Sequence, residues 1–212
     1  MKIKFLLALL FVVGLGFTSM AQSISVGPRV GATFAKISIA GDDSDEFNEE
    51  IKSNAGVQIG AVANVMINDM FSIQPELLLV QKGFKVGEDG DFMKVKTNYL
   101  ELPVLAKVNF GTEELHGFVT AGPTAGYLMN GKMKMEFDGE EEEEDLEFED
   151  EDNRLELGAS FGVGLGYKVG AGTLNLDVRY GLGISSLYET EGDEEKTRNR
   201  VFGVSVAYLF GL

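Results

Sequence analysis

The stretch "LELGASFGVGLGYK", Leu155 to Lys168, decides the fold, because two kinds of residue alternate along it. Every second residue is apolar or aromatic, and the residues between them are glycine, serine or charged. A helix would mix the two sets, whereas a strand puts successive side chains on opposite faces. The stretch therefore predicts a β-strand with one apolar face, made of Leu155, Leu157, Ala159, Phe161, Val163, Leu165 and Tyr167.

The same alternation recurs along the chain. It is clear near residues 100–108, 174–184 and 201–212, and less regular near 23–36, 56–67, 71–82 and 116–129. These segments exceed the roughly 5 to 6 residues of an average soluble strand and fit the ~9–11 of a tilted membrane strand. In the clear segments the apolar face carries no charge, and the other face is too small and polar for a soluble core. Because lipid tolerates no unpaired edge, we predict an all-β fold, an eight-stranded antiparallel transmembrane β-barrel.

The connections between these segments alternate between short and long. Residues 68–69, 111–115 and 170–172 form short links, and residues 37–55, 83–97, 130–153 and 185–198 form long ones. Bacterial barrels have short periplasmic turns and long external loops, so both termini are expected on the periplasmic side. That side should also carry an aromatic girdle of Phe71, Phe110, Tyr167, Tyr208 and Phe210.

The N-terminus predicts a secretory signal peptide. Two lysines precede an apolar run that ends in small residues, with cleavage expected between Ala21 and Gln22. A membrane anchor is the alternative, but the run is shorter than the ~20 residues of a spanning helix. Residues 22–212 then form one barrel domain. The net charge of −16 argues against non-specific nucleic-acid binding, which needs Lys and Arg.

The third long link holds an acidic run, Glu136 to Asp152, in which thirteen of seventeen residues are Asp or Glu. Such low complexity and self-repulsion predict a surface loop that is disordered without a partner. Clustered carboxylates suit calcium, although the spacing matches no EF-hand, so any binding should be weak. A solvated surface segment that deters aggregation is the alternative, and no other cofactor is expected. The candidate calcium ligands are Glu140, Glu141, Glu142, Glu143, Glu144 and Asp145.

Charges of both signs fall on the polar faces of the strands and should point into the lumen. Unpaired charge is costly in a low-dielectric interior, so we expect ion pairs that stiffen the barrel. A conduction path is the alternative, but eight strands leave no aqueous channel. The predicted lumen cluster is Arg29, Glu76, Lys82, Glu101, Lys107, Glu156, Lys168, Asp177 and Arg179.

Enzymatic chemistry has little support in the sequence. The single histidine, His116, follows a short turn and lies far from the long loops. The glycines of "GVGLG", Gly162 to Gly166, alternate along one strand face, whereas a nucleotide-binding loop needs a strand-to-helix turn. We therefore predict a protein that is not an enzyme.

Four stretches resemble the PorT-like family of small outer-membrane β-barrel proteins. They are "SIQPELLLVQKGF" (72–84), "NYLELPVLAKVNF" (98–110), "AGPTAGYLM" (121–129) and "LNLDVRYGLGISSL" (174–187). The resemblance implies an eight-stranded barrel in the outer membrane of a Gram-negative bacterium. Its namesake is associated with a secretion system that exports adhesins and proteases in gliding bacteria. Two functions stay open: a surface barrel whose external loops have structural or binding duties, and an accessory subunit of a secretion apparatus.

The C-terminus resembles the assembly signal of bacterial barrels, in Gly203, Val206, Tyr208 and Phe210. It departs from the commonest form because it ends in Gly211-Leu212 rather than on an aromatic residue. The resemblance implies two partners, the barrel-assembly machinery during insertion and outer-membrane lipid afterwards.

Overall fold

The computed structural model describes residues 24–40, 48–88, 90–148, 154–186 and 196–212, and nearly all of them are β-strand. The predicted signal peptide and its cleavage point at Ala21 and Gln22 lie outside these residues. A single helical turn, 48–50, precedes the second strand. The strands are β1 (Ile24–Ala40), β2 (Lys52–Met66), β3 (Phe71–Glu88), β4 (Asp91–Gly111), β5 (Leu115–Phe137), β6 (Glu140–Asp145), β7 (Leu155–Val169), β8 (Gly172–Gly183) and β9 (Lys196–Gly211).

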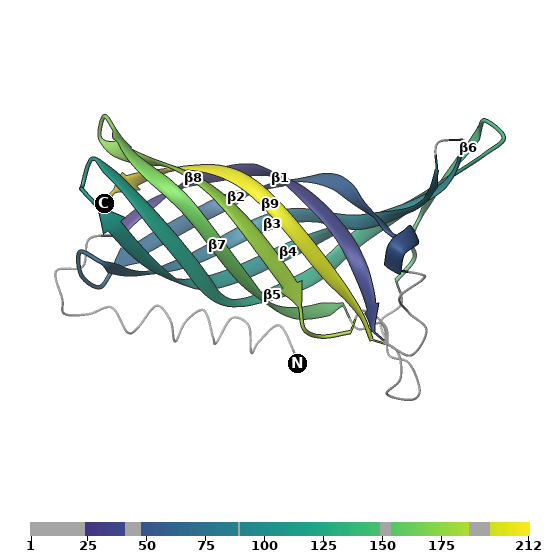
Figure 1. Ribbon diagram of the computed structural model, residues 1–212, viewed down its shortest axis with the longest axis horizontal. Coiled ribbons are helices and arrows are strands. Elements are labelled where there is room, and N and C mark those ends of the chain that lie inside the picture. The colour runs from purple at the N-terminus through teal and green to yellow at the C-terminus, as the bar shows by residue number, and fades with distance from the viewer. Residues whose placement is uncertain (1–23, 41–47, 89, 149–153, 187–195) are drawn as a thin grey trace.

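Eight of these strands close into a ring (Figure 1). Each pairs antiparallel with its neighbours in the order β4-β3-β2-β1-β9-β8-β7-β5, and pairing of β4 with β5 closes the circle. The sixth strand, β6, pairs only with β5 and stands outside the ring. The prediction of an eight-stranded antiparallel barrel is confirmed. No helix within the described ranges is long and apolar enough to cross a membrane.

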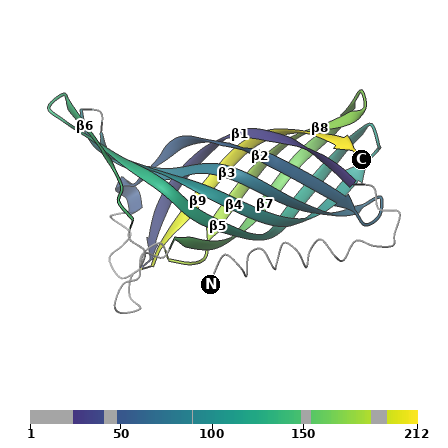
Figure 2. The ribbon, with the colours of Figure 1, turned by 180° about the vertical axis from the view of Figure 1, so that it is seen from behind.

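The two ends of the barrel differ in their connections. At the end that we name the short-turn end, residues 67–70, 112–114 and 170–171 link β2 to β3, β4 to β5 and β7 to β8. The start of β1 and the end of β9 meet there, because the amide of Leu212 donates to the carbonyl of Ile24 at 2.9 Å. The opposite end, which we name the hairpin end, carries strands that continue beyond the ring (Figure 2).

Two of the predicted long loops are largely strand, and these predictions were wrong. In place of a loop over 83–97, β3 continues to Glu88 and pairs directly with the start of β4 at Asp91. In place of a disordered loop, residues 136–145 of the acidic run lie in the end of β5, in the turn and in all of β6. Asp138 and Gly139 join these strands with φ values of 50° and 82°. Positive φ at both positions suits a two-residue hairpin turn, and Asp-Gly is a favoured pair there.

Other parts of the predicted loops lie outside the described residues, namely 41–47, 149–153 and 187–195. The loops over 37–55 and 185–198 are shorter than predicted, because β1 runs to Ala40, β2 begins at Lys52 and β9 begins at Lys196.

The ring is turned inside out relative to a soluble barrel. Polar and charged residues outnumber apolar ones among the buried residues, and large apolar side chains cover the outside. An apolar surface that wraps a whole barrel marks a membrane-facing wall. Examples from the wall, each at least 48 % exposed, are Val30, Val57, Ile59, Leu77, Leu79, Leu157, Phe161, Val163, Leu165 and Leu176.

Candidate functional site: the lumen networks and the lysine face

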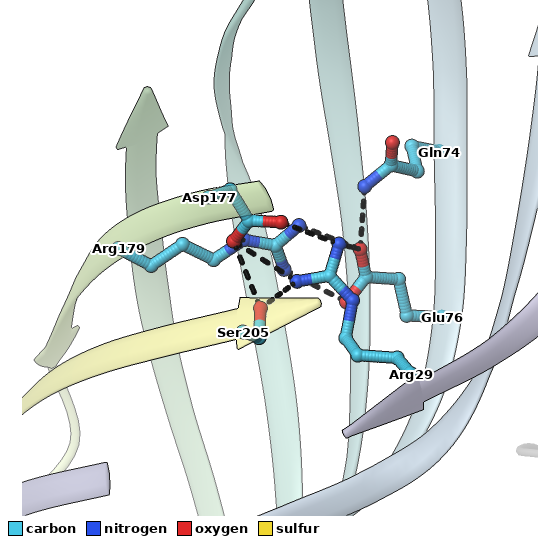
Figure 3. A network of polar contacts seen from close by, with 6 residues as sticks. All are labelled: Arg29, Gln74, Glu76, Asp177, Arg179 and Ser205. Atoms are coloured by element: carbon cyan, nitrogen blue, oxygen red, sulfur yellow. Dashed lines mark hydrogen bonds and ion pairs between the residues drawn. The ribbon is translucent and has the colours of Figure 1, made fainter. Parts of the chain in front are cut away.

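A network of buried charges crosses the lumen from β1 to β3, β8 and β9 (Figure 3). Arg29 of β1 lies at its centre and is 2 % exposed. Its guanidinium donates to Asp177 Oδ1 at 3.0 Å and to Ser205 Oγ at 2.6 Å, and a second nitrogen lies 2.9 Å from Asp177 Oδ2. That nitrogen also lies 3.5 Å from Glu76 Oε1. One side chain thus bridges two carboxylates on different strands.

Arg179 completes this network from β8. Its guanidinium donates to both oxygens of Glu76, at 2.7 and 2.8 Å, in the two-pronged geometry that Arg favours with carboxylates. Its Nε lies 3.0 Å from Asp177 Oδ1. Gln74 donates to Glu76 Oε1 at 2.6 Å, so that carboxylate has several donors. We name Arg29, Gln74, Glu76, Asp177, Arg179 and Ser205 the central network.

A second network lies nearer the hairpin end. Lys82 of β3 contacts Glu101 Oε2 of β4 and Glu156 Oε1 of β7, each at 3.0 Å. Asn199 of β9 donates to Glu156 Oε2 at 2.6 Å. The ammonium of Lys82 also lies 4.5 Å from the centroid of the Tyr99 ring, a cation–π distance. These five residues are the upper network, and it ties β3, β4, β7 and β9 together.

Glycines of β7 make room for these networks. A Cβ atom at Gly162 would lie 2.8 Å from Cγ of Arg179, and one at Gly164 would lie 2.3 Å from Cζ of Phe118. The glycines that alternate with apolar residues therefore face the lumen and admit larger side chains from β5 and β8. This geometry gives the glycine run a packing role.

The structure brings together seven of the nine predicted lumen residues in ion pairs, and places two elsewhere. Lys107 is buried but contacts an aromatic ring, with its Nζ 3.9 Å from the centroid of Phe118. Lys168 is exposed and lines a cavity at the short-turn end, because it lies one residue before β7 ends. Its assignment to the ion-pair cluster is not what the structure shows. Sequence parity missed the neutral partners, Gln74, Tyr99, Asn199 and Ser205, since polar residues on a strand face do not show whom they contact.

Beyond the ring, β3, β4, β5 and β6 form an amphipathic sheet. Register pairs Lys85 with Lys94 and Lys94 with Lys134, and it pairs Lys96 with Lys132. The pairing of β3 with β4 is unshifted from Leu79 and Leu100 of the wall, so the lysines continue the outward face. The opposite face holds Phe84, Val86, Met93, Val95, Met133 and Met135. We name the face of Lys85, Lys94, Lys96, Lys132 and Lys134 the lysine face.

A bulge sets the phase of β5 on this sheet. The β4–β5 register shifts between Asn98 and Tyr99, so one extra residue of β5 is accommodated there. Such an insertion reverses which residues face outward. Before the bulge, the odd-numbered residues Tyr127 and Met129 of β5 face outward. After it, the even-numbered Lys132 and Lys134 do so and share a face with Lys94 and Lys96.

The acidic strand β6 neutralises only the outer part of the lysine face. Lys132 donates to Glu143 at 2.6 Å, and Lys134 lies 2.7 Å from Glu141. The hydrogen bond to Glu143 raises the pKa of Lys132, and the same bond lowers the pKa of Glu143. Among the described residues Lys94 forms no ion pair. Partial burial, and then the charges of Lys96, Lys85 and Lys134, lower its pKa.

The predicted calcium ligands are spread along β6. Successive side chains of a strand point to opposite faces, so the six carboxylates do not converge on one point in this strand. In the part of the chain that the structure describes, no group of three His, Cys, Asp or Glu residues could hold a metal ion. Calcium binding by Glu140 to Asp145 stays a prediction.

The predicted assembly signal lies along β9. Gly203 faces the lumen, while Val206 and Phe210 face outward. The rings of Tyr208 and Phe210 pack edge to face, with their centroids 4.7 Å apart. The hydroxyl of Tyr208 donates a hydrogen bond to the carbonyl of Val169 at 2.8 Å. Recognition by the barrel-assembly machinery stays a prediction.

The sequence matches one family model over most of its length. Residues 20–189 match the outer membrane protein beta-barrel domain. The chain belongs to this family. The protein is therefore an integral outer-membrane barrel of a Gram-negative bacterium, and its apolar wall faces lipid. No curated protein shows a significant match to the sequence.

Several solved structures are similar to this one, all at low sequence identity. Neisserial surface protein A is 14% identical, with 89% of this chain and 98% of that chain covered and a TM-score of 0.44. Ail of Yersinia pestis, solved with the heparin analogue sucrose octasulfate, is 12% identical, with 88% and 99% covered and a TM-score of 0.42. The protease OmpT of Escherichia coli is 8% identical, with 92% and 99% covered and a TM-score of 0.40.

Proposed function

We propose that this barrel is not an enzyme and that its hairpin end binds anionic groups at the outer surface of the membrane. The observation that carries the proposal is the lysine face, which continues the lipid-facing wall beyond the ring. In this orientation the short turns and both termini are periplasmic, as is usual for bacterial barrels. The lysines then lie at the level of the lipid headgroups.

The distribution of charge supports this proposal. Within the lysine face, Lys132 and Lys134 form ion pairs with carboxylates of β6. Lys94 and Lys96 form no ion pair among the described residues. Like charges in neighbouring rows repel, and an external anion relieves that repulsion. Basic side chains close to an anionic membrane surface each add about 1 kcal/mol to its attraction.

The lumen supports a binding role over transport or catalysis. The central and upper networks fill the interior at two levels, and eight strands enclose no aqueous channel. The chain's single histidine, His116, lies at the short-turn end, away from the lysine face.

The test compares two pairs of lysines on one face. The full mature barrel in detergent micelles is titrated with diphosphorylated lipid A and with its dephosphorylated form, and bound lipid is counted by native mass spectrometry. We expect Lys94→Gln with Lys96→Gln to weaken binding of the phosphorylated form roughly tenfold or more. The matched control, Lys132→Gln with Lys134→Gln, should weaken it less than about threefold, because β6 already neutralises those lysines. Equal binding of both lipid forms by the unaltered protein contradicts the proposal.

A second function, an accessory role in a secretion system, rests on the PorT-like resemblance and on a lateral surface. The outer wall has a groove of about 540 Å³ across β4, β5, β7, β8 and β9, a shape that suits a membrane-embedded partner. It is lined by Ala106, Val119, Ala121, Phe161, Val163 and Tyr180. Surface and secreted proteins from cells with and without the gene decide this alternative: loss of a class of exported proteins supports it, and an unchanged profile removes it.

A further inference from the structure

The barrel contains a cavity of about 580 Å³ at the short-turn end. Small-molecule sites commonly have volumes of about 300–1,000 Å³, so the space suits a small ligand. Its lining comes from the ends of the strands at the short-turn end and from the short turns themselves. The residues that line it include Asn64, Lys107, Asn109, His116, Lys168 and Asn175. Its two carboxylates, Asp69 and Glu113, are exposed residues of the short turns.

Lys107 lines this cavity as a buried cation without a carboxylate. Its side chain is 3 % exposed, and its ammonium lies over the ring of Phe118. Across the described ranges it forms no ion pair or hydrogen bond, whereas Arg29, Lys82 and Arg179 each contact carboxylates. A buried charge is costly unless it is paired, so the site lacks one counter-charge.

The charges around Lys107 are also out of balance. Arg29 and Arg179 act on it as neighbouring cations, and Glu76 and Asp177 as neighbouring anions. Three positive groups therefore face two negative ones at this level of the lumen. The carboxylates are already held by the two arginines, at distances of 2.7 to 3.0 Å. The excess positive charge lies next to the cavity.

Neutral groups in and beside the cavity also have unused hydrogen-bonding capacity. Asn175 is 2 % exposed and Asn64 is 8 % exposed, and the side-chain oxygen of each is buried without a partner in the described structure. Ser72, directly opposite Lys107 on β3, is 2 % exposed and its hydroxyl is likewise unpartnered. Buried polar groups of this kind are normally satisfied by a ligand or by ordered water.

We propose that this cavity binds a small anion, the carboxylate or phosphate group of a periplasmic molecule, with Lys107 as its counter-charge. The buried amides of Asn64 and Asn175 hydrogen-bond the rest of the ligand, whereas Ser72 lies beside the cavity and is not part of its lining. The site is independent of the lysine face at the other end of the barrel, and either can exist without the other.

His116 is a built-in reporter for this site. It is the only histidine of the chain, it lines the cavity, and its ring lies 6.4 Å from the ring of Phe118. In untagged full mature barrel, the Cε1–H resonance of this imidazole is followed by NMR in detergent micelles. Sodium phosphate and sodium acetate are titrated in separate arms at fixed pH, with sodium chloride at matched ionic strength as the blank. We expect a saturable shift with phosphate or acetate and none with chloride.

Two substitutions test the role of Lys107. Lys107→Met should weaken the saturable binding at least roughly tenfold, because it removes the counter-charge. Lys168→Met, at an exposed lysine of the same cavity, is the matched control and should change the affinity less than about threefold.

Ser72→Asp keeps the test decisive if Lys107→Met fails to fold. The introduced carboxylate would lie directly across from Lys107 on the paired strand and supply an internal counter-charge. This variant should fold and lose the saturable shift, whereas Ser72→Asn should keep it. A wild-type barrel that gives no saturable shift overturns the proposal, and so does a shift that survives Ser72→Asp.

Discussion

The central network and the β5–β6 pairs use the same chemistry in opposite surroundings. In the lumen, Arg29 and Arg179 meet Glu76 and Asp177 with side chains at most 9 % exposed. On the hairpin, Lys132 meets Glu143 with both side chains more than half exposed. Water and ions screen the exposed pair, while the buried groups have only one another. Ion pairs therefore stabilise the ring strongly and the hairpin only weakly.

The largest effect should come from breaking the central network. Glu76→Gln leaves two buried guanidiniums facing one carboxylate, and removing one partner of a buried pair costs about 3–5 kcal/mol. The free energy of unfolding is measured by urea titration of the barrel in lipid vesicles. Glu142→Gln on exposed β6 is the control and should leave the midpoint unchanged. If Glu76→Gln lowers the free energy of unfolding by less than about 1 kcal/mol, the central network is not a main source of the ring's stability.

A smaller loss should follow from filling the space that a glycine leaves for its neighbour. Gly164→Ala places a Cβ atom 2.3 Å from Cζ of Phe118, and overpacking typically costs about 1–3 kcal/mol. Gly181→Ala on β8 is the matched control, because its Cβ would meet nothing nearer than 3.7 Å. The same urea titration checks both. Equal midpoints for the two variants would contradict the packing role of the β7 glycines.

Acid should loosen the hairpin and spare the ring. The hydrogen bond from Lys132 holds the pKa of Glu143 below the ordinary 4.5, so this carboxylate stabilises the hairpin above that value. The contribution is lost as pH falls through the lowered pKa. Amide hydrogen exchange should show β6 losing protection as the pH falls below 4.5 while β8 keeps it. Loss of protection in both strands at the same pH would contradict the contrast between ring and hairpin.

The smallest effect should come from calcium. Glu141 and Glu143 already contact lysines, and the strand spreads the remaining carboxylates of β6 over two faces. We expect binding no tighter than the millimolar range of the weakest calcium modules, on the order of 10⁻³ M. Calorimetry of the detergent-solubilised barrel measures it, and Glu140→Gln with Glu142→Gln, which removes two of the candidate ligands, should weaken it further. Micromolar binding would mean that the carboxylates converge when the ion is present.

The sequence contains local signals for the β3–β4 and β5–β6 hairpins, although both segments were predicted to be loops. Asp-Gly occurs at 89–90 and 138–139, and lysine alternates with apolar residues shortly after the first turn, at 93–96, and shortly before the second, at 132–135. Those are the marks of β-hairpins. The density of Asp and Glu after residue 139 predicted disorder instead. That prediction did not consider that the lysines of the neighbouring strand would pair with these carboxylates.

Alternation along single strands determined the barrel, its apolar wall and the inward direction of its charges, because the two-residue period is a local property of the backbone. Only the tertiary structure decided which charges meet. Ring closure and register bring Arg29 to Asp177, which lies 148 residues further along the chain. The bulge beside Tyr99 sets the phase of the lysine face, and register leaves Lys107 opposite Ser72 rather than a carboxylate. Such pairings depend on the relative stagger of strands far apart in sequence, and no single strand carries that information.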